Sequence, residues 1–227
     1  MNIQALDSAA TSGVNKRTDE ERRYYETNAA LYDSALASLY DAVAFPLYRI
    51  RRRVVHLARA AAGIRVLDMA TGTGAQARAF SDVGAHVVGV DLSARMLAVA
   101  RRKNRDPNTT FIEDDATALP MPDESFDVGC VSLTLHEMPP SVRSRAVHEL
   151  ARVTRRGGTV VVVDFARPRN RIWRTIVLGV LGLLERDAFS EFVRFDLRTL
   201  LSQHGIRVRD VHRALLDTVQ IVVGIRC

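Results

Sequence analysis

A glycine-rich turn between a short apolar strand and a helix constrains this chain more than any other feature. The strand residues VLDM run directly into ATGTGAQA, which places Gly72, Gly74 and Ala77 in a Gly-x-Gly-x-x-Ala pattern. Glycines let the backbone turn sharply and approach a ligand at a helix N-terminus, where free N–H groups favour anions. Asp91 ends the next predicted strand, about 20 residues further on, where a carboxylate can accept two ribose hydroxyls. The alternative is an ordinary tight turn with a solvated aspartate.

Strands and helices alternate on both sides of this turn. The predicted strands are 64–69, 86–90, 109–112, 126–132 and 159–165, and the predicted helices between them are 75–83, 94–102 and 141–155. Such alternation is typical of a parallel sheet with helices on both faces. The run TVVVVDF at 159–165 is apolar at successive positions, as expected of a central strand that is buried on both faces.

The pattern changes near the C-terminus. A helix over 196–203 leads to two strands, 206–212 and 219–225, which are separated by a short link. A short link cannot make a parallel crossover, so these two strands are predicted to pair antiparallel at one edge of the sheet. The fold class predicted is therefore α/β: a seven-stranded Rossmann-like sheet with an antiparallel last strand and a helical N-terminal cap.

The region before the first strand is predicted to form a tail and the cap. Residues 1–20 are polar and lack the apolar segment of an export signal, so we expect a mobile tail. Residues 21–62 have apolar side chains at helical spacing, and Pro46 is expected to open a helix over 47–61. The longest uncharged apolar run, 175–184, is well below the roughly 20 residues that a membrane span needs. These features predict a cytoplasmic protein.

Composition narrows the classes of partner. The chain has 227 residues, 47% of them apolar, which suits one domain with a real core. Lys and Arg outnumber Asp and Glu by 32 to 26, and a net charge of +6 permits nucleic acid, phospholipid headgroups or acidic substrates as partners. No Asn/Asp-Pro-Pro-Tyr motif follows the fourth strand, which argues against nucleic acid. Two cysteines indicate a reducing compartment, and no Cys/His spacing predicts a metal site.

Four segments together resemble the class I S-adenosylmethionine-dependent methyltransferases in motif order and spacing. They are VLDMATGTG, VVGVDLSARMLAVAR, EDDATALPMPDESFDV and RRGGTVVVVDF. The resemblance is strongest to the group that holds the ubiquinone and menaquinone C-methyltransferases. It implies S-adenosylmethionine as cofactor and a single methyltransferase domain over 21–227. The implied parts are a helical cap (21–62), a cofactor-binding core (63–165), a substrate lid (166–195), and the last helix with the edge strands (196–227).

The resemblance also implies cofactor contacts at matching positions. They are Ala70, Gly72 and Gly74 at the methionine part, Asp91 at the ribose, Leu92 and Met96 on adenine, Asp115 and Ala116 at its amino edge, and Ser132 at the sulfonium side, while Asp68 orders the loop. Ordinary core packing is the alternative for Leu92 and Met96. For Asp115 the alternatives are a turn acid and a register shifted to Asp114. Two Tyr-Asp pairs, at 32–33 and 40–41, both resemble the pair that the family has near its N-terminus.

His136 is the candidate catalytic residue. Methyl transfer from a sulfonium is an in-line displacement in which the cofactor supplies the electrophile. The protein must align the acceptor and, where needed, remove a proton. His136 follows the fourth strand in SLTLHEM, at the predicted ligand edge of the sheet. The alternative role is to orient the loop. The well-known quinone enzymes carry an Arg-containing sequence at this point, so SLTLHEM departs from their pattern.

The segment 172–184 bears on the acceptor. It is apolar on every face and follows four arginines, at positions 167, 169, 171 and 174. Such a helix is buried or faces lipid or an apolar ligand. We therefore predict methylation of an apolar or lipid-like acceptor, with carbon methylation of a prenylated quinol as the leading example. The alternatives are a phospholipid amine N-methyltransferase and a small-metabolite methyltransferase. Contact with an anionic membrane and packing against a second copy in a homodimer both remain open.

Overall fold

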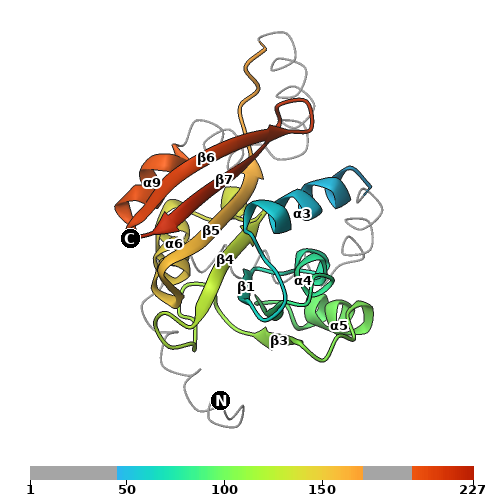
Figure 1. The fold of residues 1–227 in the computed structure, drawn as a ribbon. Coiled ribbons are helices and arrows are strands. Elements are labelled where there is room, and N and C mark those ends of the chain that lie inside the picture. The colour runs from blue at the N-terminus through green and yellow to red at the C-terminus, as the bar shows by residue number, and fades with distance from the viewer. Residues whose placement is uncertain (1–44, 171–195) are drawn as a thin grey trace.

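Seven strands form a single sheet in this computed structural model, which describes residues 45–170 and 196–227 (Figure 1). The strands are β1 (Arg65–Met69), β2 (His86–Asp91), β3 (Thr109–Glu113), β4 (Phe126–Ser132), β5 (Thr154–Phe165), β6 (Ile206–Ala214) and β7 (Val219–Arg226). The helices are α3 (Phe45–Leu57), α4 (Ala75–Ser81), α5 (Ala94–Lys103), the short 3₁₀ helix η3 (Leu135–Glu137), α6 (Pro140–Val153) and α9 (Leu197–Gln203).

The strand order is β3-β2-β1-β4-β5-β7-β6. Strands β1 to β5 pair in parallel, whereas β7 lies antiparallel between β5 and β6. The short β6–β7 link forces this arrangement, because a hairpin reverses the chain direction. The predicted fold class, including the antiparallel last strand, is confirmed.

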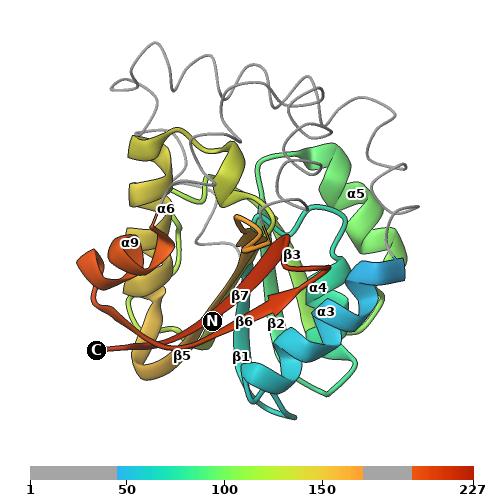
Figure 2. The same ribbon diagram turned by 90° about the horizontal axis from the view of Figure 1, so that it is seen from above.

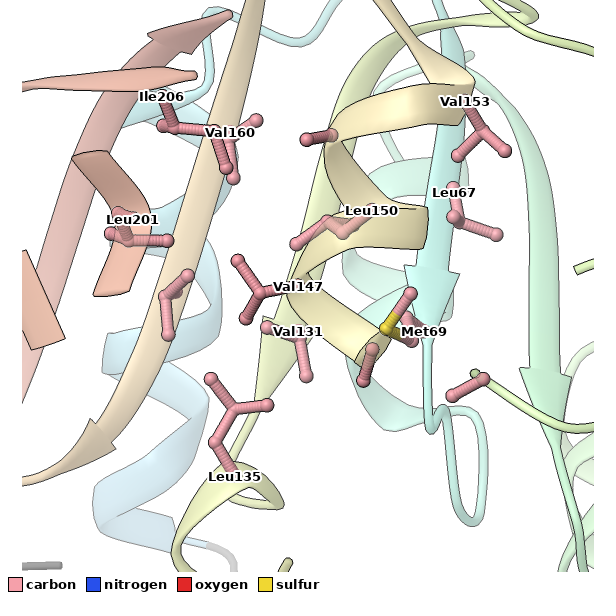
Figure 3. Close-up of a cluster of buried hydrophobic side chains, with 14 of the residues drawn as sticks. Leu67, Met69, Val131, Leu135, Val147, Leu150, Val153, Val160, Leu201 and Ile206 are labelled. Carbon is pink, nitrogen blue, oxygen red and sulfur yellow. The ribbon is translucent and has the colours of Figure 1, made fainter. Parts of the chain in front are cut away.

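Two apolar layers cover the two faces of the sheet. Along β1, Val66 packs in a cluster with α3, α4 and α5, whereas Leu67 and Met69 pack in a cluster with α6 and α9. Figure 2 shows these two groups of helices on opposite sides of the strands. Figure 3 shows the second cluster, in which Val147 and Leu150 of α6 point toward the sheet. This alternation follows from the two-residue period of a strand.

Several predicted boundaries differ from the structure, most of all the end of α3 and the start of β5. Helix α3 ends at Leu57 rather than at 61, because the backbone at Arg59 is left-handed, with φ of 55°. Strand β5 begins at Thr154 rather than at 159, and α6 ends at Val153 rather than at 155. The RRGG sequence resembles a helix terminus, but here it forms an irregular start of β5, where the pairing register with β4 shifts. The Thr154 hydroxyl donates to the Leu150 carbonyl oxygen at 2.6 Å and satisfies the end of α6.

Several predictions fall outside the described residues. They are the tail (1–20), the cap before residue 45, both Tyr-Asp pairs, and the lid from residue 171 to 195. Within residues 45–170 and 196–227, no helix is long and apolar enough to cross a membrane.

Candidate functional site

The carboxyl ends of the central strands form the edge at which a ligand is expected. Strand β1 is flanked by β2 on one side and β4 on the other, so the strand order changes direction at β1. Open α/β sheets bind ligands in the crevice outside the carboxyl ends of the strands at such a point. The glycine turn, Asp91 and His136 all follow strands that end there.

The glycine turn has three residues in the left-handed region: Ala70 (φ 53°), Gly72 (φ 55°) and Gly74 (φ 74°). The two glycines serve different needs. A Cβ atom added to Gly74 would lie 2.8 Å from the Ala100 Cβ, so this glycine allows α4 to pack closely against α5. A Cβ added to Gly72 would have no heavy atom of the described residues within 4 Å. The space beside Gly72 is therefore open to a ligand.

Asp91 joins the two loops that surround this space. Its Oδ2 accepts a hydrogen bond from the Gly72 N–H at 2.8 Å, and its Oδ1 accepts one from the Ser93 N–H at 2.9 Å. Burial raises the pKa of Asp91, and these backbone hydrogen bonds oppose the rise. Each carboxylate oxygen has a second acceptor site. Asp91 can therefore orient the loops and still accept bonds from two hydroxyl groups of a ligand.

Asp68 holds the glycine turn from its buried side. Its carboxylate is 1% exposed, and its Oδ2 accepts a hydrogen bond from the Thr71 hydroxyl at 2.5 Å. Burial raises the pKa of Asp68 to about 7, and the Thr71 bond and the positive charge of Arg51 oppose that rise. Asp68 thus orders the turn from inside the core, whereas Gly72 and Asp91 lie at the open space.

The predicted adenine-contacting residues lie in two different environments. Leu92 is 46% exposed directly after Asp91, whereas Met96 and Ala116 are buried. The exposed Leu92 offers an apolar surface to a flat ring next to the Asp91 carboxylate. The Asp115 Oδ1 accepts hydrogen bonds from the N–H and hydroxyl groups of Thr117, both at 2.8 Å. Asp114, the alternative to Asp115, donates its N–H to the Asp91 carbonyl oxygen at 3.1 Å.

The loop after β4 runs from Ser132, which is half-buried, into η3. His136 lies on η3, and its ring is 1% exposed. Its Nδ1 is 2.8 Å from the Asp164 Oδ1, and its backbone N–H donates to the Asp164 Oδ2 at 3.2 Å. Its Nε2 faces the Glu137 Oε1 at 3.6 Å, and Phe165 packs edge-on against the ring at 4.7 Å between centroids. His136 is therefore held in one orientation beneath the ligand edge.

Sequence reasoning missed two residues that hold this loop, Asp164 and Arg143. Asp164 is fully buried at the end of β5, and Arg143 is 1% exposed on α6. The Arg143 Nε donates to the Leu135 carbonyl oxygen and its Nη2 to the Met138 carbonyl oxygen, both at 2.8 Å. Each residue had a signal in the sequence. Asp164 directly follows the apolar run VVVV of β5, and Arg143 lies on the buried face of the amphipathic helix α6.

The described residues contain no group of three or more His, Cys, Asp or Glu side chains that could hold a metal ion.

Comparison with known proteins decides the family. A family model described as a methyltransferase domain matches residues 66–158. A demethylmenaquinone methyltransferase of Renibacterium salmoninarum is 38% identical over 165 residues, which cover 73% of this chain and 67% of that protein. A ubiquinone/menaquinone biosynthesis C-methyltransferase of Shewanella frigidimarina is 31% identical over 214 residues, 87% of this chain and 83% of that protein. The chain belongs to the class I S-adenosylmethionine-dependent methyltransferases.

Solved structures with lower identity share the fold of this methyltransferase. Magnesium protoporphyrin IX methyltransferase from Synechocystis, determined with bound S-adenosylmethionine, matches with a TM-score of 0.68 at 17% identity. The match covers 94% of this chain and all of that one. The [4+2]-cyclase SpnF matches with a TM-score of 0.63 at 20% identity, over 79% of this chain and 81% of that one. One of these two structures carries a name other than methyltransferase, so the fold alone does not define the reaction.

The cofactor of the family is S-adenosylmethionine, and the ligand edge of this methyltransferase fits it. The fit rests on the open space beside Gly72, on the remaining acceptor sites of Asp91 and on the exposed side chain of Leu92. These features suit the amino-acid part, the ribose and the adenine, in that order along the edge. All the cofactor-binding residues named from the sequence remain predictions.

Proposed function

We propose that this methyltransferase methylates a carbon atom of an apolar, lipid-like acceptor, and that this acceptor is a prenylated quinol. The observation that carries the proposal is the similarity to a ubiquinone/menaquinone biosynthesis C-methyltransferase over 87% of this chain. A demethylmenaquinone methyltransferase with 38% identity supports the same class of acceptor. The departure at SLTLHEM is the reason why the acceptor must be tested directly.

The roles of the cofactor-binding residues follow from the site. When bound, S-adenosylmethionine supplies a methyl group on a positively charged sulfur, which an electron-rich carbon can attack. We assign the ribose hydroxyls to Asp91 and the amino-acid part to the open side of the turn at Gly72. Asp68 keeps the turn in place through Thr71. Ser132, at the carboxyl end of β4, is assigned to the sulfonium side of the site.

His136 is assigned the proton chemistry. Removing a proton from a quinol hydroxyl makes the neighbouring ring carbons more nucleophilic, and histidine accepts protons near neutral pH. The bond between Nδ1 and Asp164 fixes the ring and stabilises a positive charge on it, as a carboxylate partner does in other enzymes. The same bond turns Nε2 toward Glu137. Burial of the ring reduces competition from water.

The experiment uses S-adenosylmethionine with a labelled methyl group. The protein is incubated separately with a total lipid extract and with a soluble extract of bacterial cells, and labelled products are identified by mass spectrometry. Label on a quinol carbon in the lipid fraction is expected. Label on a phospholipid amine, or only on a small soluble metabolite, would contradict the proposal and support one of the two alternatives.

A further inference from the structure

The turn between β6 and β7 exposes two adjacent leucines. Leu215 is 37% exposed and Leu216 is 75% exposed. The described residues include five large exposed apolar side chains, and the other three are Tyr48, Leu92 and Val83. Leu92 directly follows β2, and Figures 1 and 2 place the start of α3, which carries Tyr48, at the same end of the sheet as the β6–β7 turn. The residue after β2, the β6–β7 turn and the start of α3 therefore lie at the same end of the sheet.

The turn is held in a defined shape. Leu215, Leu216 and Asp217 are all left-handed, with φ of 45°, 54° and 73°. Side chains with a Cβ rarely adopt this conformation. The Leu215 carbonyl oxygen accepts bonds from the N–H and the hydroxyl of Thr218, at 3.1 and 2.6 Å. The Ala166 N–H donates to the Thr218 carbonyl oxygen at 2.8 Å and ties the turn to the end of β5.

Arginines surround the leucines. Arg167 and Arg169 are exposed, and Arg213 is half-buried beside them. Asp217 is the only acidic residue in the sequence segments 166–170 and 214–218. It accepts the Arg169 N–H at 2.6 Å and lies 3.8 Å from the Arg213 Nε. The guanidinium groups of Arg169 and Arg213 therefore share one carboxylate, and together with Arg167 they give the turn a net positive charge.

Helix α3 extends this basic surface. Tyr48, 55% exposed, lines a hollow of about 630 Å³ together with Arg49, Arg52, Arg53 and His56. Among residues 45–170 and 196–227, no acidic side chain lines this hollow. The Arg53 Nη2 is 3.2 Å from the His212 Nδ1, which places α3 directly beside β6. From this contact, the first turns of α3 and the last residues of β6 extend to the same edge of the sheet (Figure 1).

We propose that the β6–β7 turn and the first two turns of α3 form a docking surface for an anionic lipid bilayer. Leucines insert at the boundary of the acyl chains, and guanidinium groups bind phosphate groups of the lipids. This combination favours a bilayer over nucleic acid, because exposed leucines add little to binding of a phosphate backbone. The inference deepens the proposed function, since docking by this edge would bring the site to a membrane-dissolved acceptor.

Vesicle flotation tests the surface without using activity. The full-length protein is mixed with phosphatidylcholine vesicles, with or without phosphatidylglycerol. Binding to the vesicles with phosphatidylglycerol is expected, and it should weaken as salt rises. The Leu215→Ser/Leu216→Ser variant should bind at least about ten-fold more weakly, because burial of each leucine contributes to partitioning. Val83→Ser is the matched control. Val83 is 40% exposed but lies in the turn that precedes β2, at the opposite end of the sheet from the ligand edge. The Val83→Ser variant should therefore bind the vesicles like the wild type.

Charge variants and a competitor complete the test. Arg49→Gln/Arg52→Gln should lower binding to the phosphatidylglycerol vesicles and reduce its salt dependence. Failure of the wild type to bind them would overturn the inference, as would wild-type binding by the double leucine variant. Duplex RNA, added at a phosphate concentration equal to that of the vesicles, serves as the competitor. If it releases the protein from the vesicles, and does so equally for the double leucine variant, the surface binds nucleic acid instead. The assay measures no methyl transfer, so vesicle binding stands even if the quinol assignment fails.

Discussion

The Nδ1 of His136 lies 2.8 Å from the Oδ1 of Asp164, so that a hydrogen bond joins the loop after β4 to the end of β5. The same carboxylate accepts the backbone N–H groups of His136 and Phe165. Asp164 is therefore the point at which the loop, the ring and the neighbouring strand are held together. This arrangement gives the first prediction, because it links the orientation of one ring to the rate of the reaction.

Replacing His136 by Gln should lower kcat about a hundred-fold, while the affinity for S-adenosylmethionine stays within about two-fold of the wild type. Rates across pH and calorimetry measure the two effects. Asp164→Asn is the companion variant and should lower kcat with the fold intact. Full activity of a folded His136→Gln protein would make His136 a residue of loop structure only.

Replacing Asp91 by Ala should weaken S-adenosylmethionine binding about ten- to a hundred-fold, since a hydrogen bond to a charged group contributes roughly 1.5–3 kcal/mol. The variant also removes the acceptor of the Gly72 and Ser93 N–H groups, so the turn itself loses support. Isothermal titration calorimetry gives the affinity, and circular dichroism checks the fold. Unchanged affinity would contradict the assignment of Asp91 to the ribose. Tighter binding of NADH than of S-adenosylmethionine would contradict it as well.

The two glycines of the turn should respond differently to alanine. Both require a left-handed backbone, which costs alanine about 1 kcal/mol. Gly74→Ala must also push aside Ala100 and Phe111, so we expect its melting temperature to fall further than that of Gly72→Ala. Gly72→Ala should fold but bind the cofactor more weakly, because its methyl group enters the open space. Equal melting temperatures would show that α4 and α5 can move apart.

Asp68 should make stability depend on pH. Burial raises its pKa from 3.8 to about 7, so the folded protein keeps a proton that the unfolded chain releases. The free energy of unfolding therefore falls as pH rises from about 4 to about 7, by at most roughly 1.4 kcal/mol per unit of pKa difference. Above pH 7 it changes little. Asp68→Asn cannot ionise and still accepts from Thr71. Its melting temperature relative to wild type should thus increase between pH 4 and pH 8. A constant difference would mean that Asp68 titrates normally.

The sequence predicted the sheet well because most of its signals are local. Alternation of strands and helices, the short link before β7 and the glycine turn each depend on neighbouring residues. The sequence also predicted that the glycine turn and Asp91 lie at one edge of the sheet, because the family spacing marks both and parallel strands end at the same edge. The hydrogen bond between Gly72 and Asp91 shows that they are adjacent. The contact between His136 and Asp164 depends on the register of β4 against β5, and no local pattern carries that information. The same reason explains the error at β5, where pairing with β4 overrides a sequence typical of a helix terminus.

The place of β7 has a consequence for how the chain reaches its native state. Seven of its residues pair with the apolar centre of β5, yet it follows β5 and β6 in the chain. During synthesis, one edge of the run VVVV in β5 therefore has no strand to pair with until β7 has been made and inserts between β5 and β6. An unpaired apolar edge of this kind recruits other chains. A stop codon or a frameshift just before Val219 would remove β7 and leave the facing edges of β5 and β6 without their hydrogen-bond partner. We expect such a product to aggregate.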